Sequence, residues 1–491
     1  MAPRGLLLLT LVVFSVVVCK SFTSISSDAA RFHRLEHSGI FSANASSENK
    51  GNGDDATIIP NPILQEVHSR FQKYRSKPYH ASHIERILLL SDLHCDYAEN
   101  REWISNLSEM MDTSEVSPQE TMILLAGDVS HDLQILRWTF QTLKKTFAEV
   151  AFVPGNHELW LDENADEKDV CADSIHKLER IMQICVDEDI RIGPVKVGSL
   201  WIVPLLSWHH LSFDSEPPIC SETWARVPTA SKTVKVGSDY RKTVWPGPIS
   251  PLDDSVAQLV DSLNDIILDI DKIDNELDDD ATILTFSHFL PRVELLPEKR
   301  YLSLPTLPAC SGSTFLENRL RGLHKKLSRR NNGEEIRHLH GFGHSHLAFD
   351  LVLDQVRYVH APLAYPKEWK QRRRSLEIGT MAGDQSRFRF PVTIWEKDIN
   401  FPPRTLGGWW STYYKVMPRE PHKNKELAPW VARRFKRRTS AAIVEDFDHV
   451  KMEMKYQLQH PSHFSANGTW YAEKQTMKSR RNKISHSKDN I

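Results

Sequence analysis

Residues 87–94 read Ile87-Leu88-Leu89-Leu90-Ser91-Asp92-Leu93-His94. Four consecutive apolar residues are typical of a strand that is buried on both faces. The run is followed directly by Asp92 and His94, whose side-chain types bind metal ions in proteins. Because alternate residues of a strand point to the same face, we expect these two side chains to face the same way and to share one ion.

The same arrangement, an apolar run followed by polar side chains, recurs along the chain. Met122–Ala126 precedes Gly127-Asp128, and Val150–Val153 precedes Pro154-Gly155-Asn156-His157. Apolar residues at helical spacing separate these runs, between residues 103 and 111 and between residues 133 and 143. The resulting β-α-β-α-β order predicts parallel strands, whose functional side chains lie at the carboxyl ends.

Later segments continue the alternation of strands and helices. Further helices are predicted around residues 175–185 and 256–270, and further strands at 200–206, 281–286, 336–346, 356–360 and 392–395. The sequence therefore predicts an α/β fold.

Polar residues at the ends of the apolar runs form one set. In chain order they are Asp92-x-His94, Gly127-Asp128, Gly155-Asn156-His157-Glu158, His288 and Gly343-His344-Ser345-His346. Imidazole and carboxylate ligands suit Mn, Fe, Zn and similar divalent ions, and one carboxylate can bridge two ions. Each short motif arises by chance in many chains, and a single histidine after a strand is usually structural. Five motifs in one order, each at a strand end, indicate a metal site.

These motifs resemble the signature of the calcineurin-like metallophosphoesterases, which is D-x-H, G-D, G-N-H-[DE], H and G-H-x-H. All five are present without a substitution, and the resemblance covers residues 84 to about 400. It implies a sandwich of two β-sheets flanked by helices (α/β/β/α). Some phrases resemble an uncharacterised plant and algal branch of the family and extend the domain to residues 84–435; they are Ser91–Tyr97, Thr285–Arg292, Ala361–Pro366 and Leu427–Val431.

The resemblance implies a role for each residue of the set. One of two divalent ions would be held by Asp92, His94 and His346, and the other by Asn156, His288 and His344. Asp128 would bridge the two ions. His157 would not be a ligand; it would lie near the leaving oxygen and act as a general acid.

The predicted function is a metal-dependent phosphoester hydrolase in which the two ions activate a water for in-line attack on phosphorus. The sequence leaves open the substrate class and whether the substrate is a phosphate monoester or a diester. One alternative is a phosphodiesterase acting on cyclic nucleotides or nucleic acid. Another is a non-catalytic, metal-binding scaffold of the same fold, although such members usually lack some of the residues that are complete here.

Four further features could shape the site, each with a simpler structural interpretation. Asp96 could support His94, His209 could line the cleft, and Arg292 could grip a second phosphate; ordinary surface or packing roles are the alternatives. Residues 211–252 form an insertion of undetermined role.

Composition sets the outer limits of the interpretation. The chain has 491 residues, 40% of them apolar, and 62 basic against 64 acidic residues give a net charge of −2. These values exclude a disordered chain, a collagen and a multi-span membrane protein. Residues 251–280 carry a net charge of −10 and residues 421–491 a net charge of +8. No specific nucleic-acid partner is indicated, but the basic tail at 436–491 could touch an anionic surface.

The first residues are typical of a targeting segment. Arg4 precedes an apolar run of 14 residues, Leu6–Cys19, which is shorter than a membrane span, so residues 1–20 are predicted to be a signal peptide. An uncleaved signal anchor is the alternative, and Phe22 with its Ser-rich surroundings resembles a two-part plastid leader. Residues 21–83 are predicted to be a leader or linker of low order.

Overall fold

The computed structural model describes residues 61–435 apart from 111–115, 162–170, 270–272, 274–275, 278–279, 329–335, 369–390 and 403–408. The predicted signal segment, the predicted leader up to residue 60 and the predicted basic tail lie outside the described residues. Among the described helices, none combines the length and the apolar character that crossing a membrane requires.

A four-stranded sheet contains the strands that the first motifs predict. Its order is β11-β2-β3-β4, with β2 (Arg86–Leu90), β3 (Thr121–Ala126), β4 (Glu149–Val153) and β11 (Val392–Glu396). Strands β2, β3 and β4 run parallel, and β11 pairs with β2 in the antiparallel direction. Their connections carry α3 (Ala98–Ser105), α4 (Leu107–Met110) and α5 (Leu133–Thr146). The predicted β-α-β-α-β order is confirmed.

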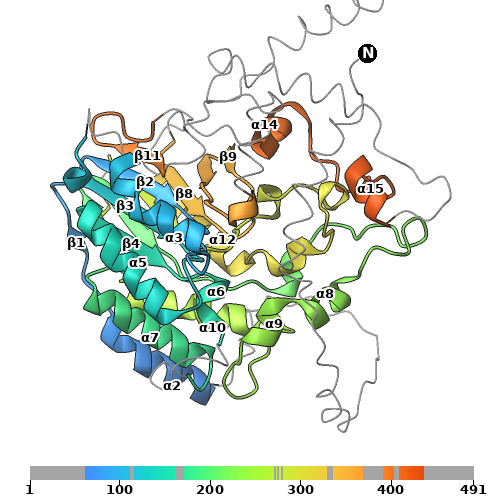
Figure 1. The fold of residues 1–491 in the computed structure, drawn as a ribbon, viewed down its shortest axis with the longest axis horizontal. Helices are drawn as coiled ribbons and strands as arrows, with labels where there is room; N and C mark the ends of the chain where they lie inside the picture. The colour runs from blue at the N-terminus through green and yellow to red at the C-terminus, as the bar shows by residue number, and fades with distance from the viewer. Residues whose placement is uncertain are drawn as a thin grey trace, which may run out of the picture.

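A seven-stranded sheet holds β1 and the strands from β5 to β10 (Figure 1). Its order is β1-β5-β6-β7-β8-β10-β9, with β1 (Tyr79–His80), β5 (Val195–Val197), β6 (Leu200–Pro204), β7 (Thr282–Phe286), β8 (His338–Phe342), β9 (Phe349–Leu353) and β10 (Val356–His360). Strands β6, β7, β8 and β10 run parallel. The sequence analysis missed β9, which forms a hairpin with β10 through Asp354 and Gln355, both at positive φ.

The two faces of β2 explain why that strand is apolar throughout. Ile87 and Leu89 belong to a buried cluster that lies between the two sheets, together with side chains of β7 and β8. Leu88 and Leu90 belong to a second cluster, together with side chains of α5. Because both faces are covered, neither can be polar; burying each such side chain contributes about 1.5–3 kcal/mol.

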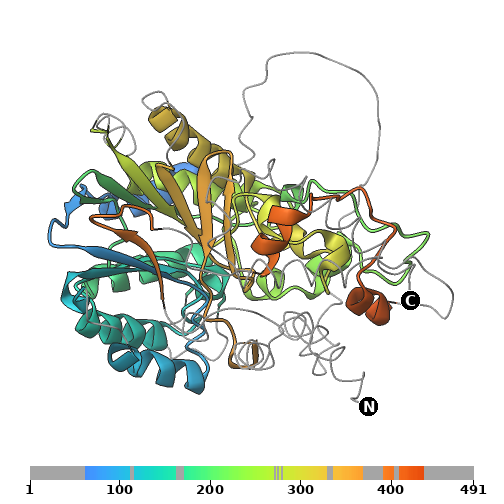
Figure 2. The same ribbon diagram turned by 90° about the horizontal axis from the view of Figure 1, so that it is seen from above.

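Helices lie outside both sheets and give the four layers α/β/β/α (Figure 2). The described helices of more than ten residues beyond α5 are α2 (Asn61–Phe71), α7 (Ser174–Asp187), α10 (Ser255–Ile267) and α12 (Thr314–Ser328). Helix α10 contacts α12 and α2, and α2 also contacts α7. The predicted α/β sandwich flanked by helices is confirmed.

The prediction of low order for residues 21–83 does not hold for its last part. Val67 and Phe71 of α2 are buried, and Tyr79 of β1 pairs with Val195 of β5. The folded part of the chain therefore includes residues from 61 rather than from 84. Apolar residues at helical spacing, Ile63, Val67 and Phe71, carried this signal in the sequence.

Short helices and a small third apolar cluster complete the described structure. The cluster joins Trp224 to α14 (Trp409–Val416) and α15 (Pro429–Phe435), so residues up to 435 belong to the folded unit. The remaining short helices are α6 (Asn156–Leu159), α8 (Ala230–Val236), α9 (Ser238–Lys242) and the 3-10 helices Gln72–Tyr74, Pro118–Glu120, Leu211–Phe213, Val293–Leu295, Lys299–Tyr301 and Leu307–Cys310.

A buried histidine in β8 makes the stability of the fold sensitive to acid. His340 bonds to the Thr285 and Ser287 hydroxyls, and burial lowers its pKa to about 3. An unfolded histidine takes up its proton near pH 6.5, so the free energy of unfolding should fall as the pH falls from about 6.5 towards 3. In urea unfolding at pH 6, 5 and 4, the free energy of unfolding should fall less steeply for His340→Gln than for the wild type. The difference in slope should be about 1.4 kcal/mol per pH unit. Equal slopes would contradict this account.

Candidate metal centre

The predicted ligands converge at the carboxyl ends of five strands. Asp92 and His94 follow β2, Asp128 follows β3, Asn156 begins the helix after β4, His288 follows β7, and His344 and His346 follow β8. Asp92, His94, Asp128 and His288 are at most 2% exposed. The structure thus brings all seven predicted ligands together, at the edge where open α/β sheets place their sites.

The local backbone differs from the prediction. Strand β2 ends at Leu90, so Asp92 and His94 do not share a face by strand alternation. Both lie in the left-handed region, with φ of 53° and 44°, and so do Asp128, His344 and His346. Aspartate and histidine enter this region more readily than most residues. The paired D-x-H and H-x-H side chains therefore meet because of tight turns beyond the strand ends.

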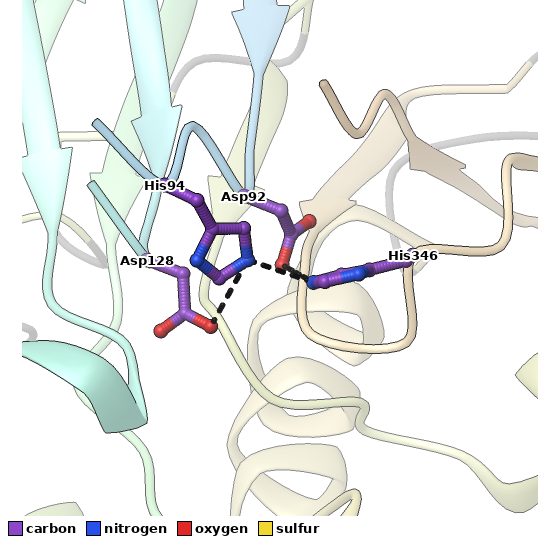
Figure 3. Close-up of side chains that lie close together, drawn as sticks. All are labelled: Asp92, His94, Asp128 and His346. Atoms are coloured by element: carbon purple, nitrogen blue, oxygen red, sulfur yellow. Dashed lines mark hydrogen bonds and ion pairs between the residues drawn. The ribbon is translucent and has the colours of Figure 1, made fainter. Parts of the chain in front are cut away.

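The first group of ligand atoms surrounds one point (Figure 3). Nε2 of His94 lies 2.9 Å from Nε2 of His346 and 4.0 Å from Oδ2 of Asp128. Oδ1 of Asp92 lies 3.6 Å from Nε2 of His346. One ligand atom from each of the four residues lies within 4.8 Å of the others, a spacing that suits one divalent ion.

A second group lies on the other side of Asp128. Nε2 of His288 is 3.0 Å from Oδ1 of Asn156 and 3.3 Å from Nδ1 of His344. The same nitrogen is 3.4 Å from Oδ1 of Asp128. Asp128 therefore turns one carboxylate oxygen toward each group.

The electrostatics of the two groups fit cations. Burial lowers the pKa of His94 and His344, and lowers that of His288 to about 4, so these rings are in the neutral form that binds metals. Burial and the neighbouring carboxylates of Glu158 and Asp92 raise the pKa of Asp128. A cation between these carboxylates would offset their repulsion. The donor set of carboxylate, amide and imidazole thus suits a divalent metal centre.

Three further residues hold the ligands in place. Oε1 and Oε2 of Glu158 accept hydrogen bonds from the backbone N–H groups of Gly155 and of residues 128–130, at 2.6–2.9 Å. Nε2 of His360 bonds Oδ2 of Asp92 at 2.9 Å, and Oε2 of Glu368 bonds Nδ1 of His346 at 2.8 Å. Such partners fix the orientation of ligands. Glu158 is visible in the G-N-H-E motif, and His360 ends a predicted strand, but Glu368 carried no signal in the sequence.

Gly127 allows two strand ends to approach closely. Its φ of 78° lies in the left-handed region, and a Cβ atom there would lie 2.4 Å from Nδ1 of His288. A side chain at this position would displace His288 from the second group.

His157 lies beside the first group, with its ring centroid 4.7 Å from that of His94. Its Nε2 is 3.8 Å from Oδ2 of Asp128 and 3.5 Å from the hydroxyl of Tyr365. The ring packs on Trp160, with centroids 3.7 Å apart, and burial lowers its pKa to about 3. Tyr365, which the sequence analysis missed, also stacks on His94 at 4.2 Å.

The other side chains singled out in the sequence have defined surroundings. Asp96 accepts from Ser130 at 2.6 Å and pairs with His131 at 3.0 Å, and one oxygen lies near His94 and His157. Arg292 pairs with Glu294 and Asp354, so its guanidinium is engaged by carboxylates rather than aimed at a phosphate. Burial raises the pKa of the Cys95 thiol to about 12, which makes it unreactive.

Comparison with known proteins relates part of the chain to a known family. Residues 85–233 match the family model described as calcineurin-like phosphoesterase. Residues 85–233 carry a calcineurin-like phosphoesterase domain. The matched segment contains Asp92, His94, Asp128, Asn156 and His157, and the later motifs lie beyond it. The predicted family is confirmed, whereas the plant and algal branch stays a prediction.

The individual proteins that the chain resembles are more distant. The [acyl-carrier-protein] phosphodiesterase PptH of Mycobacterium tuberculosis is 35% identical over 71 residues, which are 14% of this chain and 20% of the relative. The chain thus aligns with about a fifth of that protein's length. The crystal structure of phosphopantetheinyl hydrolase PptH from the same organism has a TM-score of 0.42 and 19% identity, covering 59% of this chain and 93% of that one. A cold-active protein-tyrosine phosphatase of a Shewanella species has a TM-score of 0.24 and 14% identity, over 58% and 74% of the chains.

The shared carboxylate of Asp128 can be tested by metal content. Asp128→Asn replaces one charged oxygen with an amide nitrogen that cannot bind a cation, so the variant should lose at least one metal ion per chain. Elemental analysis after dialysis against Mn²⁺ measures this directly. Asp398→Asn, at an exposed position in the turn after β11, is the matched control and should keep the wild-type content. Full wild-type occupancy in Asp128→Asn would rule out the bridging assignment.

Proposed function

We propose that this domain is a phosphoester hydrolase that uses two divalent ions. The observation that carries the proposal is the position of Asp128, whose two oxygens face two separate groups of buried ligand atoms. Asp92, His94 and His346 would hold one ion, and Asn156, His288 and His344 the other. Bound ions would supply Lewis-acid activation of water and would offset negative charge on the phosphoryl oxygens.

His157 is the proton donor in this proposal. Its ring is fixed by the packing on Trp160, and its Nε2 lies 3.8 Å from Asp128 Oδ2, beside the group that contains His94. Burial keeps the ring neutral in the free site, with a pKa of about 3. A phosphoryl anion next to the ring would favour the protonated form, which then transfers its proton to the leaving alkoxide oxygen.

Aromatic side chains bound the space beside His157. Tyr365 stacks on His94 and contacts the ring of His346 edge-on at 4.8 Å. Tyr97 is 46% exposed and meets Tyr365 edge-on at 5.5 Å. This wall runs from the ligands toward solvent, so the leaving group of a bound substrate would pass along it.

A diester substrate is the second candidate within the same chemistry. The Mycobacterium tuberculosis relative is named as a phosphodiesterase, and the aligned segment is 35% identical. The non-catalytic scaffold is less well supported, because the chain carries all seven predicted ligand residues and His157. The complete set is what catalysis requires, whereas a scaffold would not need His157 beside the ligands.

A substrate panel tests the proposed activity. The purified chain, loaded with Mn²⁺, Fe²⁺ or Zn²⁺, should hydrolyse p-nitrophenyl phosphate or bis(p-nitrophenyl) phosphate, and a chelator should abolish the hydrolysis. The ratio of the two rates separates monoesterase from diesterase. A chain that binds two ions but hydrolyses neither compound, nor cyclic nucleotides, would contradict the proposal and favour the scaffold.

The role of His157 has its own test. His157→Ala should keep the wild-type metal content and lower turnover by about 10²–10⁴-fold, the usual contribution of a general acid. Steady-state kinetics together with elemental analysis measure both quantities. His176→Ala, a histidine on α7 whose side chain is 47% exposed, is the control and should retain full activity. Unchanged turnover in His157→Ala would remove this residue from the chemistry.

A further inference from the structure

The side chain of Asn156 is held in one orientation by a residue outside both sheets. Nδ2 of Asn156 donates to Oδ1 of Asp239 at 2.9 Å. A carboxylate accepts hydrogen bonds but cannot donate them, so the amide nitrogen must face Asp239. The amide oxygen consequently points the other way, where it lies 3.0 Å from Nδ1 of His344 and 3.0 Å from Nε2 of His288.

Asp239 makes a second contact that leads to His157. The same oxygen, Oδ1, accepts a hydrogen bond from Nε1 of Trp160 at 2.7 Å. The ring of Trp160 packs on the His157 ring with centroids 3.7 Å apart. Oδ2 of Asp239 faces Nε2 of His209 at 3.3 Å. One buried carboxylate, 6% exposed, thus contacts a predicted ligand and the residue that supports the predicted acid.

The segment that carries Asp239 is attached firmly beside the site. Asp239 lies on α9, within the insertion at 211–252. The backbone N–H of Leu161 donates to the carbonyl of Lys242 at 2.7 Å, and that of Ser174 donates to the carbonyl of Val244 at 2.8 Å. Nζ of Lys242 lies 4.5 Å from the centre of the Trp160 ring. These contacts join the C-terminal end of α9 and the residues after it to the chain that follows Asn156, and they hold Asp239 beside the site.

We propose that Asp239 is a positioning residue for the ion-binding group that contains Asn156, and that the insertion at 211–252 thereby sets the affinity of that half of the centre. The inference rests on the proposed two-ion centre and concerns metal binding rather than hydrolysis. Without the acceptor at Asp239, the amide of Asn156 can rotate and turn its nitrogen toward His288 and His344, where it cannot bind a cation. Asp239 bonds Asn156 and Trp160 and faces His209, and none of these three residues is a predicted ligand of the other ion.

The hydrogen bond, rather than the negative charge, carries this role. Both donors use the same oxygen of Asp239, so an asparagine can offer that oxygen to both and turn its nitrogen toward His209. Asp239→Asn therefore preserves the orientation of Asn156. Asp239→Ala removes the acceptor, and Asp239→Ser withdraws it, because the serine hydroxyl oxygen lies one bond closer to the backbone and falls short of Asn156. This contrast separates a positioning role from simple loss of packing or charge.

Calorimetric titration of the metal-free full chain with Mn²⁺ tests the inference. The wild type should bind two ions. Asp239→Ala and Asp239→Ser should bind one ion about 10–100-fold more weakly, the usual effect of losing a residue that orients a ligand, and the other with wild-type affinity. Asp239→Asn should restore the weakened site. Circular dichroism on each variant establishes that it is folded. If Asp239→Ala does not fold, Asp239→Ser, which loses less side-chain volume, provides the same measurement.

Glu222→Gln removes an exposed carboxylate from the same insertion and should bind both ions as the wild type does. Wild-type binding of both ions by Asp239→Ala would overturn the inference. So would equal weakening of both sites, or an Asp239→Asn variant as weak as Asp239→Ala. A chain that shows the expected pattern yet hydrolyses no phosphoester would refute the proposed activity and leave this inference intact.

Discussion

The carboxylate of Asp128 lies between two groups of ligand atoms, and the rest of the site is arranged around it. Its Oδ2 faces His94 at 4.0 Å and its Oδ1 faces His288 at 3.4 Å. Burying this carboxylate next to Asp92 is unfavourable without cations, which is why its pKa is raised by burial and by the neighbouring carboxylates. Glu158 fixes the turn that presents it, through hydrogen bonds to three successive N–H groups.

The fold maintains strained turns at the site. Five of the predicted ligands have left-handed backbones, each of which costs about 1–2 kcal/mol in an ordinary residue. Hydrogen bonds between neighbouring strand ends stabilise them: the N–H of Asp92 donates to the carbonyl of Gly127 at 3.0 Å, and that of His94 to the carbonyl of Asp128 at 2.8 Å. The apolar cluster between the sheets fixes the positions of the strands from which these turns begin.

Much of this arrangement was predictable from the sequence because it depends on local pattern. The apolar runs identified the parallel strands, and the residues after them identified the ligands. The geometry of the turns was not predictable: the sequence analysis placed Asp92 and His94 on one face of a strand, whereas both follow its end in left-handed turns. Glu368 and Asp239 were missed because each reaches the site through tertiary packing from a segment without a motif. Tyr365 lies in the phrase Ala361–Pro366, whose resemblance to a family branch gave no indication that this side chain reaches the site. The start of the domain was misplaced because it was set by the family resemblance, which begins at residue 84, whereas α2 lies before that point.

Anomalous diffraction from crystals of the chain soaked in Mn²⁺ tests the central claim most directly. The account predicts two peaks separated by roughly 3.5–4 Å, with Asp128 between them. One should lie next to Asp92, His94 and His346, and the other next to Asn156, His288 and His344. A single peak, or two peaks that Asp128 does not join, would contradict the account.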